Sequence, residues 1–237
     1  MTPRNRKVEA FTLIELLVVI AVISILIGIL LPALGGARKI AQQMENSTKL
    51  KGIQNSMVTF ANKNNRWFPG LTNTGAEEDV NGVQGTAGIV FWELLRTAYF
   101  PPKQLLSPFE TSKSAYAGTS YNDGDYVNFN NYYSYATLDY RDVNPPTARH
   151  ANWRDTSNGQ AVVLSDRNVS GLPNEPTSIS STTRWEGSVA WNDGHVESIT
   201  GDVGQPITVP TRYDDDLPDP TDNIFDAEGT TDADMIN

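Results

Sequence analysis

One carboxylate lies inside the longest apolar run of the chain. This run extends from Phe11 to Leu34 and reads FTLIELLVVIAVISILIGILLPAL, with Glu15 as its only charged residue. An apolar helix of roughly 20 residues can cross the hydrocarbon core of a bilayer, and a carboxylate at that depth is costly without a positive partner. No Lys or Arg lies between Phe11 and Ala37. If the chain were cut before Phe11, the new α-amino group of a neighbouring copy would be a candidate partner.

Two acidic clusters elsewhere in the chain could bind calcium, which takes about six to eight oxygen ligands. The first is Asn122-Asp123-Gly124-Asp125, and the second contains Asp214, Asp215, Asp216, Asp219 and Asp222. Neither has the complete pattern of an EF-hand loop, which closes with a Glu. A disordered, self-repelling extension is the favoured alternative for the second cluster. We therefore expect no cofactor and keep calcium as the secondary hypothesis.

Residues for other kinds of chemistry are scarce. The chain has no Cys, which excludes disulfides, thiolate metal sites and cysteine nucleophiles. It has two His, His150 and His195, and it lacks a Gly-x-Ser-x-Gly elbow, a phosphate loop, a dinucleotide fingerprint and a His-Glu-x-x-His motif. We expect His195 to cap a turn or to face solvent. The chain is not expected to be an enzyme, and a tethered hydrolase that uses its acidic residues is the weakest alternative.

A short basic leader precedes the apolar run, with Arg4, Arg6 and Lys7. The sequence Phe11-Thr12-Leu13-Ile14-Glu15 follows, and the apolar stretch ends at Pro32. Together these features resemble the N-terminal processing signal of type IV prepilins and type II secretion pseudopilins. Ala10 stands where that signal usually has Gly. Because both residues are small, cleavage is still expected.

This resemblance implies processing, modification and assembly. A prepilin peptidase is expected to cut between Ala10 and Phe11 and to N-methylate Phe11, after which the apolar helix packs in the core of a helical filament. Glu15, the fifth residue after the cut, would pair with the Phe11 amine of a neighbouring subunit, and Pro32 belongs to the same assembly segment. The expected partners are the peptidase, other pilin or pseudopilin subunits in a homo- or hetero-oligomer, and the assembly platform of a secretion or pilus machine.

The basic leader also predicts the orientation of the chain. Under the positive-inside tendency, the N-terminus would stay in the cytoplasm and a single span would cross the bacterial cytoplasmic membrane, with the head periplasmic or extracellular. An ordinary signal anchor and a secretory signal peptide are the alternatives. A secretory apolar region has only about 7–15 residues, whereas the run here is longer and continues into a helical pattern.

The formal net charge of the chain is −10. Much of it lies at the C-terminus, where ten Asp and Glu from Asp202 onward stand against Arg212 alone. An acidic chain is a poor partner for phosphates, so no binding of nucleic acid is expected.

The elements that would position these residues follow from periodicity. Apolar residues recur at helical spacing after the span, at Ile40, Met44, Ile53, Met57, Phe60 and Ala61. They predict one helix from about Phe11 to Asn62, with a bend near Pro32. We expect a leader (1–10), a transmembrane assembly helix (11–34), an amphipathic helix (35–65), a globular α+β head (66–201) and an acidic, flexible tail (202–237).

The head is expected to pack an antiparallel sheet on this helix, giving an α+β, pilin-like fold. A helix is predicted at Ile89–Tyr99 and a strand at Ala161–Asp166. Ser188–Trp191 and His195–Ile199 predict a hairpin around Asn192-Asp193-Gly194, a strong turn sequence. Together with Leu106-Ser107-Pro108, Ser134-Tyr135 and Leu164-Ser165-Asp166, the sequence Asp193-Gly194-His195-Val196 resembles the heads of a pseudopilin-like group abundant in planctomycetes. The His that precedes this motif in the group is replaced here by Thr183, and Ser107 stands where Cys is frequent.

Aromatic residues leave one alternative function open. Trp92 and Trp191 lie in periodic segments and are expected in the core, whereas Trp67, Trp153 and Trp185 lie in loop-like sequence and could be exposed. Exposed Trp side chains could form a platform for glycans. The alternative is therefore a membrane-tethered carbohydrate-binding or adhesin module that does not polymerise.

Overall fold

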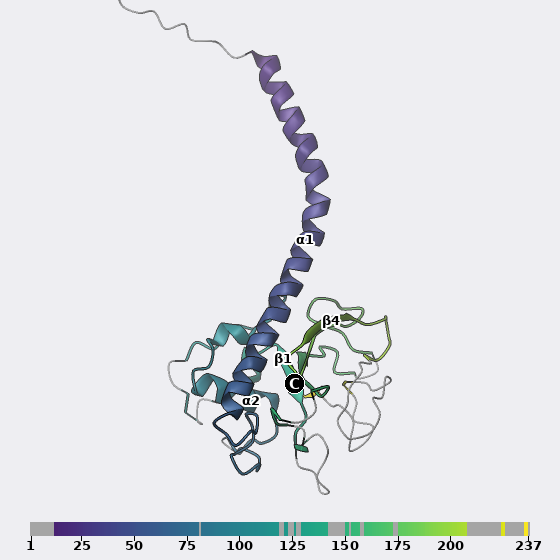
Figure 1. Ribbon diagram of the computed structural model, residues 1–237. Coiled ribbons are helices and arrows are strands. Elements are labelled where there is room, and N and C mark those ends of the chain that lie inside the picture. The colour runs from purple at the N-terminus through teal and green to yellow at the C-terminus, as the bar shows by residue number, and fades with distance from the viewer. Residues whose placement is uncertain are drawn as a thin grey trace, which may run out of the picture. The chain divides into compact units, whose positions relative to one another are not determined.

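The computed structural model describes residues 12–80, 82–118, 121–122, 126, 129–141, 150–151, 153–156, 159–172, 175–207, 224–225 and 235–236. The chain divides into two compact units, Met1–Ala41 and Gln42–Asn237. The long helix α1, Leu13–Ala61, begins in the first unit and ends in the second (Figure 1). Its observed bounds confirm the single helix expected from about Phe11 to Asn62.

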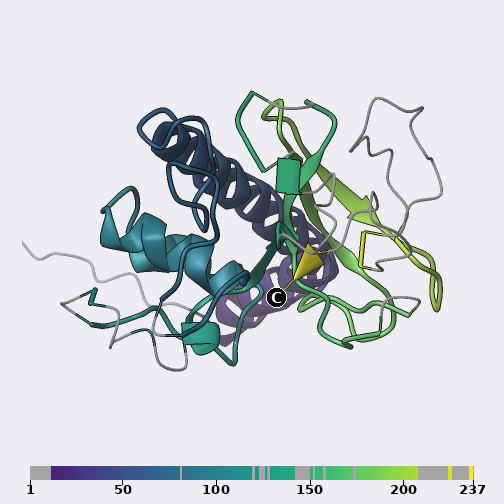
Figure 2. The ribbon, with the colours of Figure 1, turned by 90° about the horizontal axis from the view of Figure 1, so that it is seen from below.

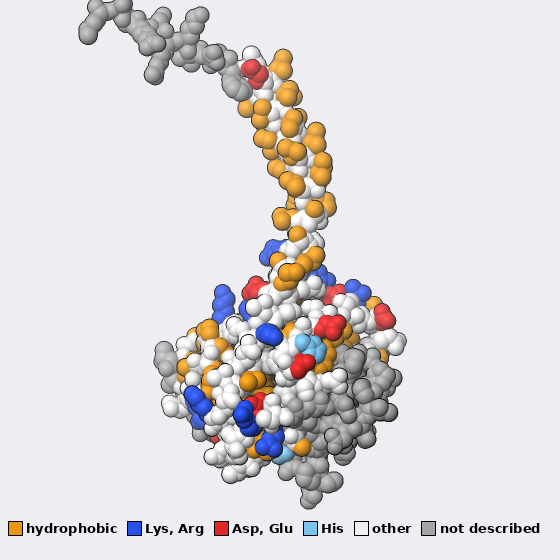
Figure 3. All heavy atoms as spheres, in the orientation of Figure 1, with side chains coloured by type: hydrophobic (Ala, Val, Ile, Leu, Met, Phe, Trp, Pro, Cys, Tyr) orange, Lys and Arg blue, Asp and Glu red, His pale blue; other side chains and the backbone are white. Residues whose placement is uncertain are grey.

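The described residues of the first unit, 12–41, contain the apolar part of α1. Its large apolar side chains are exposed, from 47% for Val19 to 82% for Leu13. The helix is long and apolar enough to cross a membrane. Figure 3 shows apolar side chains along the whole visible length of this part. Pro32 lies inside the helix, which continues through it without ending.

The second half of α1 packs in the head along one face. Leu50, Ile53, Met57 and Ala61 are fully buried there, at spacings of three and four residues. Ile40 and Met44, which belong to the same helical pattern, are 55% and 68% exposed. A polar residue, Asn46, holds the buried position one turn before Leu50.

The head contains an antiparallel sheet in the order β4-β3-β2-β1-β5. Its strands are β1 (Tyr135–Leu138), β2 (Val162–Asp166), β3 (Glu186–Trp191), β4 (Val196–Thr200) and β5 (Met235–Ile236). β3 and β4 form the expected hairpin, in which Gly194 takes a φ of 92° that favours glycine. The structure thus has the expected α+β, pilin-like arrangement of a long N-terminal helix and an antiparallel sheet.

A second helix completes the core. Helix α2, Ala87–Arg96, is buried except at its last residue, and short 3-10 helices follow at η1 (Pro102–Leu105) and η3 (Phe129–Tyr132). Trp92 on α2 is fully buried and makes edge contacts with Tyr116, Tyr121, Tyr126 and Phe129. Figure 2 shows α2 next to the second half of α1, with the strands of the sheet alongside.

The C-terminal segment is partly built into the head. Ile207, Ile224 and Phe225 are buried, and the Ile224 amide donates to the Ile207 carbonyl at 3.1 Å. β5 pairs with β1. The expectation of a flexible tail over 202–237 is therefore wrong for these residues. Their apolar side chains pack in the core, although the segment as a whole is acidic. The remainder of the tail after Ile207, including the five Asp of the second acidic cluster, lies outside the described residues.

Candidate assembly site at the start of the long helix

The first turn of α1 is a reciprocal cap between Thr12 and Glu15. The Glu15 Oε2 atom accepts from the Thr12 amide at 2.8 Å and from the Thr12 hydroxyl at 2.7 Å, and the Glu15 amide donates back to Thr12 Oγ1 at 3.3 Å. Thr-x-x-Glu is the capping-box sequence, which satisfies amides that no preceding helical turn can bond. The spacing of these two residues thus explains why the helix begins here.

This cap leaves the second oxygen of the Glu15 carboxylate able to accept further hydrogen bonds. Both hydrogen bonds from Thr12 reach Oε2, and among the described residues no cationic group lies within ion-pair distance of Glu15. An ionised carboxylate accepts several hydrogen bonds and can bind a cation with its second oxygen. The first unit therefore presents an exposed negative charge at the start of an apolar helix.

The other predicted assembly residues are placed as follows. Ala10 and Phe11, the expected processing site, lie outside the described residues. Pro32 is exposed in the interior of α1. Ser24, a second polar residue of the apolar segment, donates its hydroxyl to the Ile20 carbonyl at 2.8 Å, so the helix itself satisfies it. Glu15 is the other polar side chain between Leu13 and Leu34, and its hydrogen bonds come from Thr12 at the helix start.

A buried polar cluster joins the second half of α1 to the sheet. Asn46 Nδ2 donates to Asp166 Oδ2 at 2.6 Å, and the Ser188 amide donates to the same oxygen at 2.6 Å. The Tyr135 hydroxyl donates to Asn46 Oδ1 at 3.1 Å, and Ser47 contacts the hydroxyl of Ser188 at 2.9 Å. One helix and three strands therefore meet at a few polar atoms.

Asp166 is the titratable centre of this cluster. Burial raises its pKa from 3.8 to about 7, and the hydrogen bonds from Ser188 and Asn46 only partly oppose the rise. Asp166 was not among the residues predicted to form a site. One feature of the sequence indicated a buried polar contact here: Asn46 is in helical phase with Leu50, Ile53 and Met57 on the buried face. A polar residue in that phase predicts a polar partner across the interface, although not which one.

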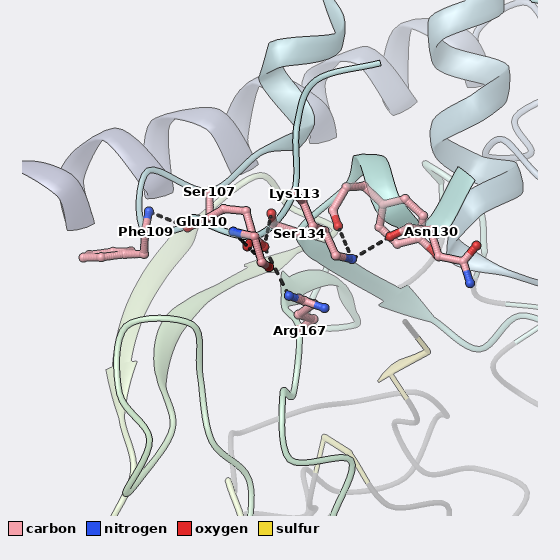
Figure 4. A network of polar contacts seen from close by, with 9 residues as sticks. Ser107, Phe109, Glu110, Lys113, Asn130, Ser134 and Arg167 are labelled. Atoms are coloured by element: carbon pink, nitrogen blue, oxygen red, sulfur yellow. Dashed lines mark hydrogen bonds and ion pairs between the residues drawn. The ribbon is translucent and has the colours of Figure 1, made fainter. Parts of the chain in front are cut away.

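A second buried network ties the loop after η1 to the sheet (Figure 4). The Glu110 carboxylate, 2% exposed, pairs with Arg167 at 3.1 Å and accepts from the Ser134 hydroxyl at 3.1 Å. Burial opposes ionisation of Glu110, but hydrogen bonds from Ser112 and Ser134 and the charge of Arg167 outweigh it and lower the pKa. The network joins residues far apart in sequence, so no local pattern indicated it.

Lys113 lies in the same network. Its ammonium donates to the carbonyls of Asn130 and Tyr133 at 2.6 and 2.7 Å. Burial, together with the positive charge of Arg167, lowers its pKa to about 8. Lys113 thus holds two backbone carbonyls in place.

The remaining candidates of the sequence analysis do not form a site in the described parts of the chain. His195 is half exposed at the hairpin turn, and its Nδ1 atom is hydrogen-bonded to Asp193 Oδ1 at 2.6 Å. Its ring stacks on the Trp191 ring, with 4.2 Å between the ring centroids. This is the turn-capping role expected for it. Within the described ranges no three His, Asp or Glu side chains gather as metal ligands. Asp123, Asp125, Asp214, Asp215, Asp216, Asp219 and Asp222 lie outside those ranges.

The expected exposure of three Trp residues is wrong for two of them. Trp153 and Trp185 are fully buried, and Trp153 stacks on Tyr140 at 5.0 Å while its indole donates to the Pro69 carbonyl at 2.8 Å. Trp67 is half-buried, and the Arg154 guanidinium covers its ring at 4.1 Å. Loop sequence does not imply exposure, because these large rings complete the core between the elements. Trp92 and Trp191 are buried as expected.

Comparison with known proteins identifies the N-terminal signal. The sequence model of the prokaryotic N-terminal methylation motif matches residues 5–31. The chain therefore carries the prepilin-type cleavage and methylation signal, and the match extends into the apolar part of α1. No curated protein and no solved structure matches the chain. The resemblance of the head to the planctomycete group stays a prediction.

Proposed function

We propose that this chain is a pilin-like subunit of a pilus or a secretion pseudopilus. A prepilin peptidase removes residues 1–10 and methylates the amine of Phe11, and the subunit then joins a filament through the first unit of α1. The methylation motif and the apolar helix support this proposal. The head has no catalytic role in it and needs no cofactor.

The observation that carries the proposal is the state of Glu15. Its carboxylate is exposed at the start of an apolar helix, and within the described ranges its hydrogen bonds reach one oxygen and come from its own cap. Processing before Phe11 creates a positive amine four residues away in the mature chain, and a neighbouring copy can bring this amine to the free oxygen. A charge left unpaired among apolar groups is strongly unfavourable, so the pair also selects the axial register between copies.

The proposed location follows from the same signal. The leader stays in the cytoplasm, the first unit of α1 spans the cytoplasmic membrane once, and the head faces the periplasm or the exterior. The proposed partners are the prepilin peptidase, further pilin or pseudopilin subunits and an assembly platform. A tethered glycan-binding module loses its main support, since the Trp side chains that would form a platform are buried or covered.

Mass spectrometry of the mature N-terminus tests the processing step. The chain, produced together with a prepilin peptidase, should begin at a methylated Phe11. The variant Ala10→Gly, which restores the usual residue before the cut, should give the same product at least as fast. A mature chain that begins at Met1, or downstream of Leu34, would refute the proposal.

Substitution of Glu15 tests the assembly step. Glu15→Ala and Glu15→Gln should both insert in the membrane but fail to enter filaments, because neither can neutralise the amine. Ser24→Ala is the matched control, since it also removes a polar group from the apolar segment and should assemble normally. Normal filaments from Glu15→Gln would contradict the ion pair, because Gln keeps the hydrogen bonds of the cap but not the charge.

A further inference from the structure

Two cationic residues follow the apolar part of α1 at a distance that matches a lipid headgroup layer. The segment from Leu13 to Leu34 has 22 residues and, at about 1.5 Å per residue, a length of about 33 Å. The hydrocarbon core of a bilayer is about 30 Å thick, and each polar layer adds about 5–8 Å. Arg38 and Lys39 stand about 6 and 8 Å beyond Leu34 along the axis. They therefore fall in the polar layer when the apolar segment fills the core.

Arg38 and Lys39 lie on the exposed surface of α1. α1 is continuous here, and both side chains are exposed. Gly35, Gly36 and Ala37 separate them from Leu34 and carry at most a methyl side chain. Ile40, the next residue, is 55% exposed. Basic residues with exposed apolar residues on both sides are typical of a helix at the membrane interface. Figure 3 shows Lys and Arg side chains directly after the apolar segment.

The rest of the chain is acidic, in contrast to Arg38 and Lys39. From Gln42 onward there are 26 Asp and Glu against 13 Lys and Arg. An anionic lipid surface repels such an acidic domain when the two are tethered within a Debye length. Arg38 and Lys39 lie in the chain between the span and this domain, where they can neutralise lipid phosphates.

We infer that Arg38 and Lys39 form a binding site for the phosphates of anionic phospholipids, in the leaflet on the side of the head. The Arg38 guanidinium can hold two oxygens of one phosphate, and the Lys39 ammonium adds a point charge. The inference rests on the proposed insertion of α1 in the membrane. Since processing removes Arg4, Arg6 and Lys7, this pair holds the depth of the mature subunit before it enters a filament.

A single introduced Cys tests the site, because the natural chain has none. Ala41→Cys, on the exposed helix just after the pair, would carry an environment-sensitive fluorophore in the full-length chain. The labelled chain is reconstituted in vesicles of phosphatidylcholine, with or without phosphatidylglycerol. Phosphatidylglycerol should shift the emission to shorter wavelength and increase quenching by nitroxide lipids several-fold, and high salt should reverse both changes.

The charge variants separate this site from a general effect of charge. Arg38→Gln/Lys39→Gln should abolish the response to phosphatidylglycerol. Lys63→Gln/Lys103→Gln, which removes the same charge from two exposed residues of the head, should respond like the parent. An undiminished response in the first variant, or a lost response in the second, would overturn the site. A response that follows the protein-to-lipid ratio instead of lipid charge would assign the pair to contacts with a second copy and overturn it too.

A second label distinguishes failure of this inference from failure of the proposed function. Ile23→Cys places the fluorophore in the middle of the apolar segment. If this label reports a lipid environment while the Ala41→Cys label ignores lipid charge, only the lipid site is refuted. If it reports water in every vesicle, the membrane insertion is refuted, and the lipid site with it.

Discussion

Asp166→Asn should make the head less sensitive to pH. The Asp166 carboxyl is buried against Asn46 and the Ser188 amide, and burial raises its pKa from 3.8 to about 7. The folded chain thus binds this proton more tightly than the unfolded chain does. The contribution of Asp166 to the free energy of unfolding is therefore fully present below about pH 4. This contribution is lost as the pH rises from about 4 to about 7. The full shift corresponds to about 4 kcal/mol of unfolding free energy.

Asn reproduces the protonated form of this side chain. Its carbonyl oxygen can accept from Asn46 and Ser188 as Oδ2 of Asp166 does, and its amide replaces the acid proton without a charge. Tyr135, the other titratable group of the cluster, stays neutral in this range, because burial and the nearby charges of Asp166 and Glu45 raise its pKa well above the ordinary value. The difference between parent and variant therefore reports Asp166 itself.

Urea unfolding of the full chain in detergent, followed by Trp fluorescence, measures this difference. Between pH 4.5 and 8 (a window set by the two pKa values), Asp166→Asn should gain up to about 4 kcal/mol relative to the parent. Glu197→Gln, which neutralises an exposed carboxylate on β4, is the control and should show no such gain. A parent-to-variant difference that is constant over this range, or that shrinks as the pH rises, would refute the assignment.

Two further predictions concern the core of the head. Arg167→Gln should cost about 3 kcal/mol of unfolding free energy, because it leaves the buried Glu110 carboxylate without its cation. The double variant Glu110→Gln/Arg167→Gln should recover part of this loss in the same urea experiment, and a simple sum of the two single losses would contradict the pairing. Trp153→Ala should cost about 3–5 kcal/mol, since it empties a fully buried site and removes the bond to Pro69. A loss of unfolding free energy below about 1 kcal/mol, which is typical of a substitution at the surface, would show that Trp153 is not in the core.

Local patterns predicted the elements of this chain well. The bounds of α1 follow from helical periodicity and from the Thr12–Glu15 cap, both of which depend on residues within one or two turns. The β3–β4 hairpin follows from alternation around Asn192-Asp193-Gly194, where glycine allows the positive φ of the turn. These features are set by short-range sterics and hydrogen bonds, so the sequence contains them in adjacent positions.

The contacts between elements could not be predicted in the same way. The Glu110–Arg167 pair joins residues 57 positions apart, and neither residue has a neighbour in sequence that indicates its partner. The acidic composition of the C-terminal segment predicted flexibility, yet Ile207, Ile224 and Phe225 enter the core. Composition averages over a segment, whereas a few apolar side chains suffice to anchor it. The same reason explains the buried Trp153 and Trp185, whose surroundings read as loop.

Glu15 and Asn46 show why the kind of partner can be predicted from sequence for one polar residue on α1 and not for the other. Each interrupts an apolar face of the same helix. For Glu15 the surroundings are apolar over more than five turns, so any partner has to come from another molecule or from a chain end, and the options are few. Asn46 faces a folded head that offers many donors and acceptors, and its choice of Asp166 depends on how the strands are ordered. A polar residue in an apolar phase marks an interface for Asn46 and predicts one for Glu15. The partner itself can be predicted from sequence only where the surroundings leave a single kind of group.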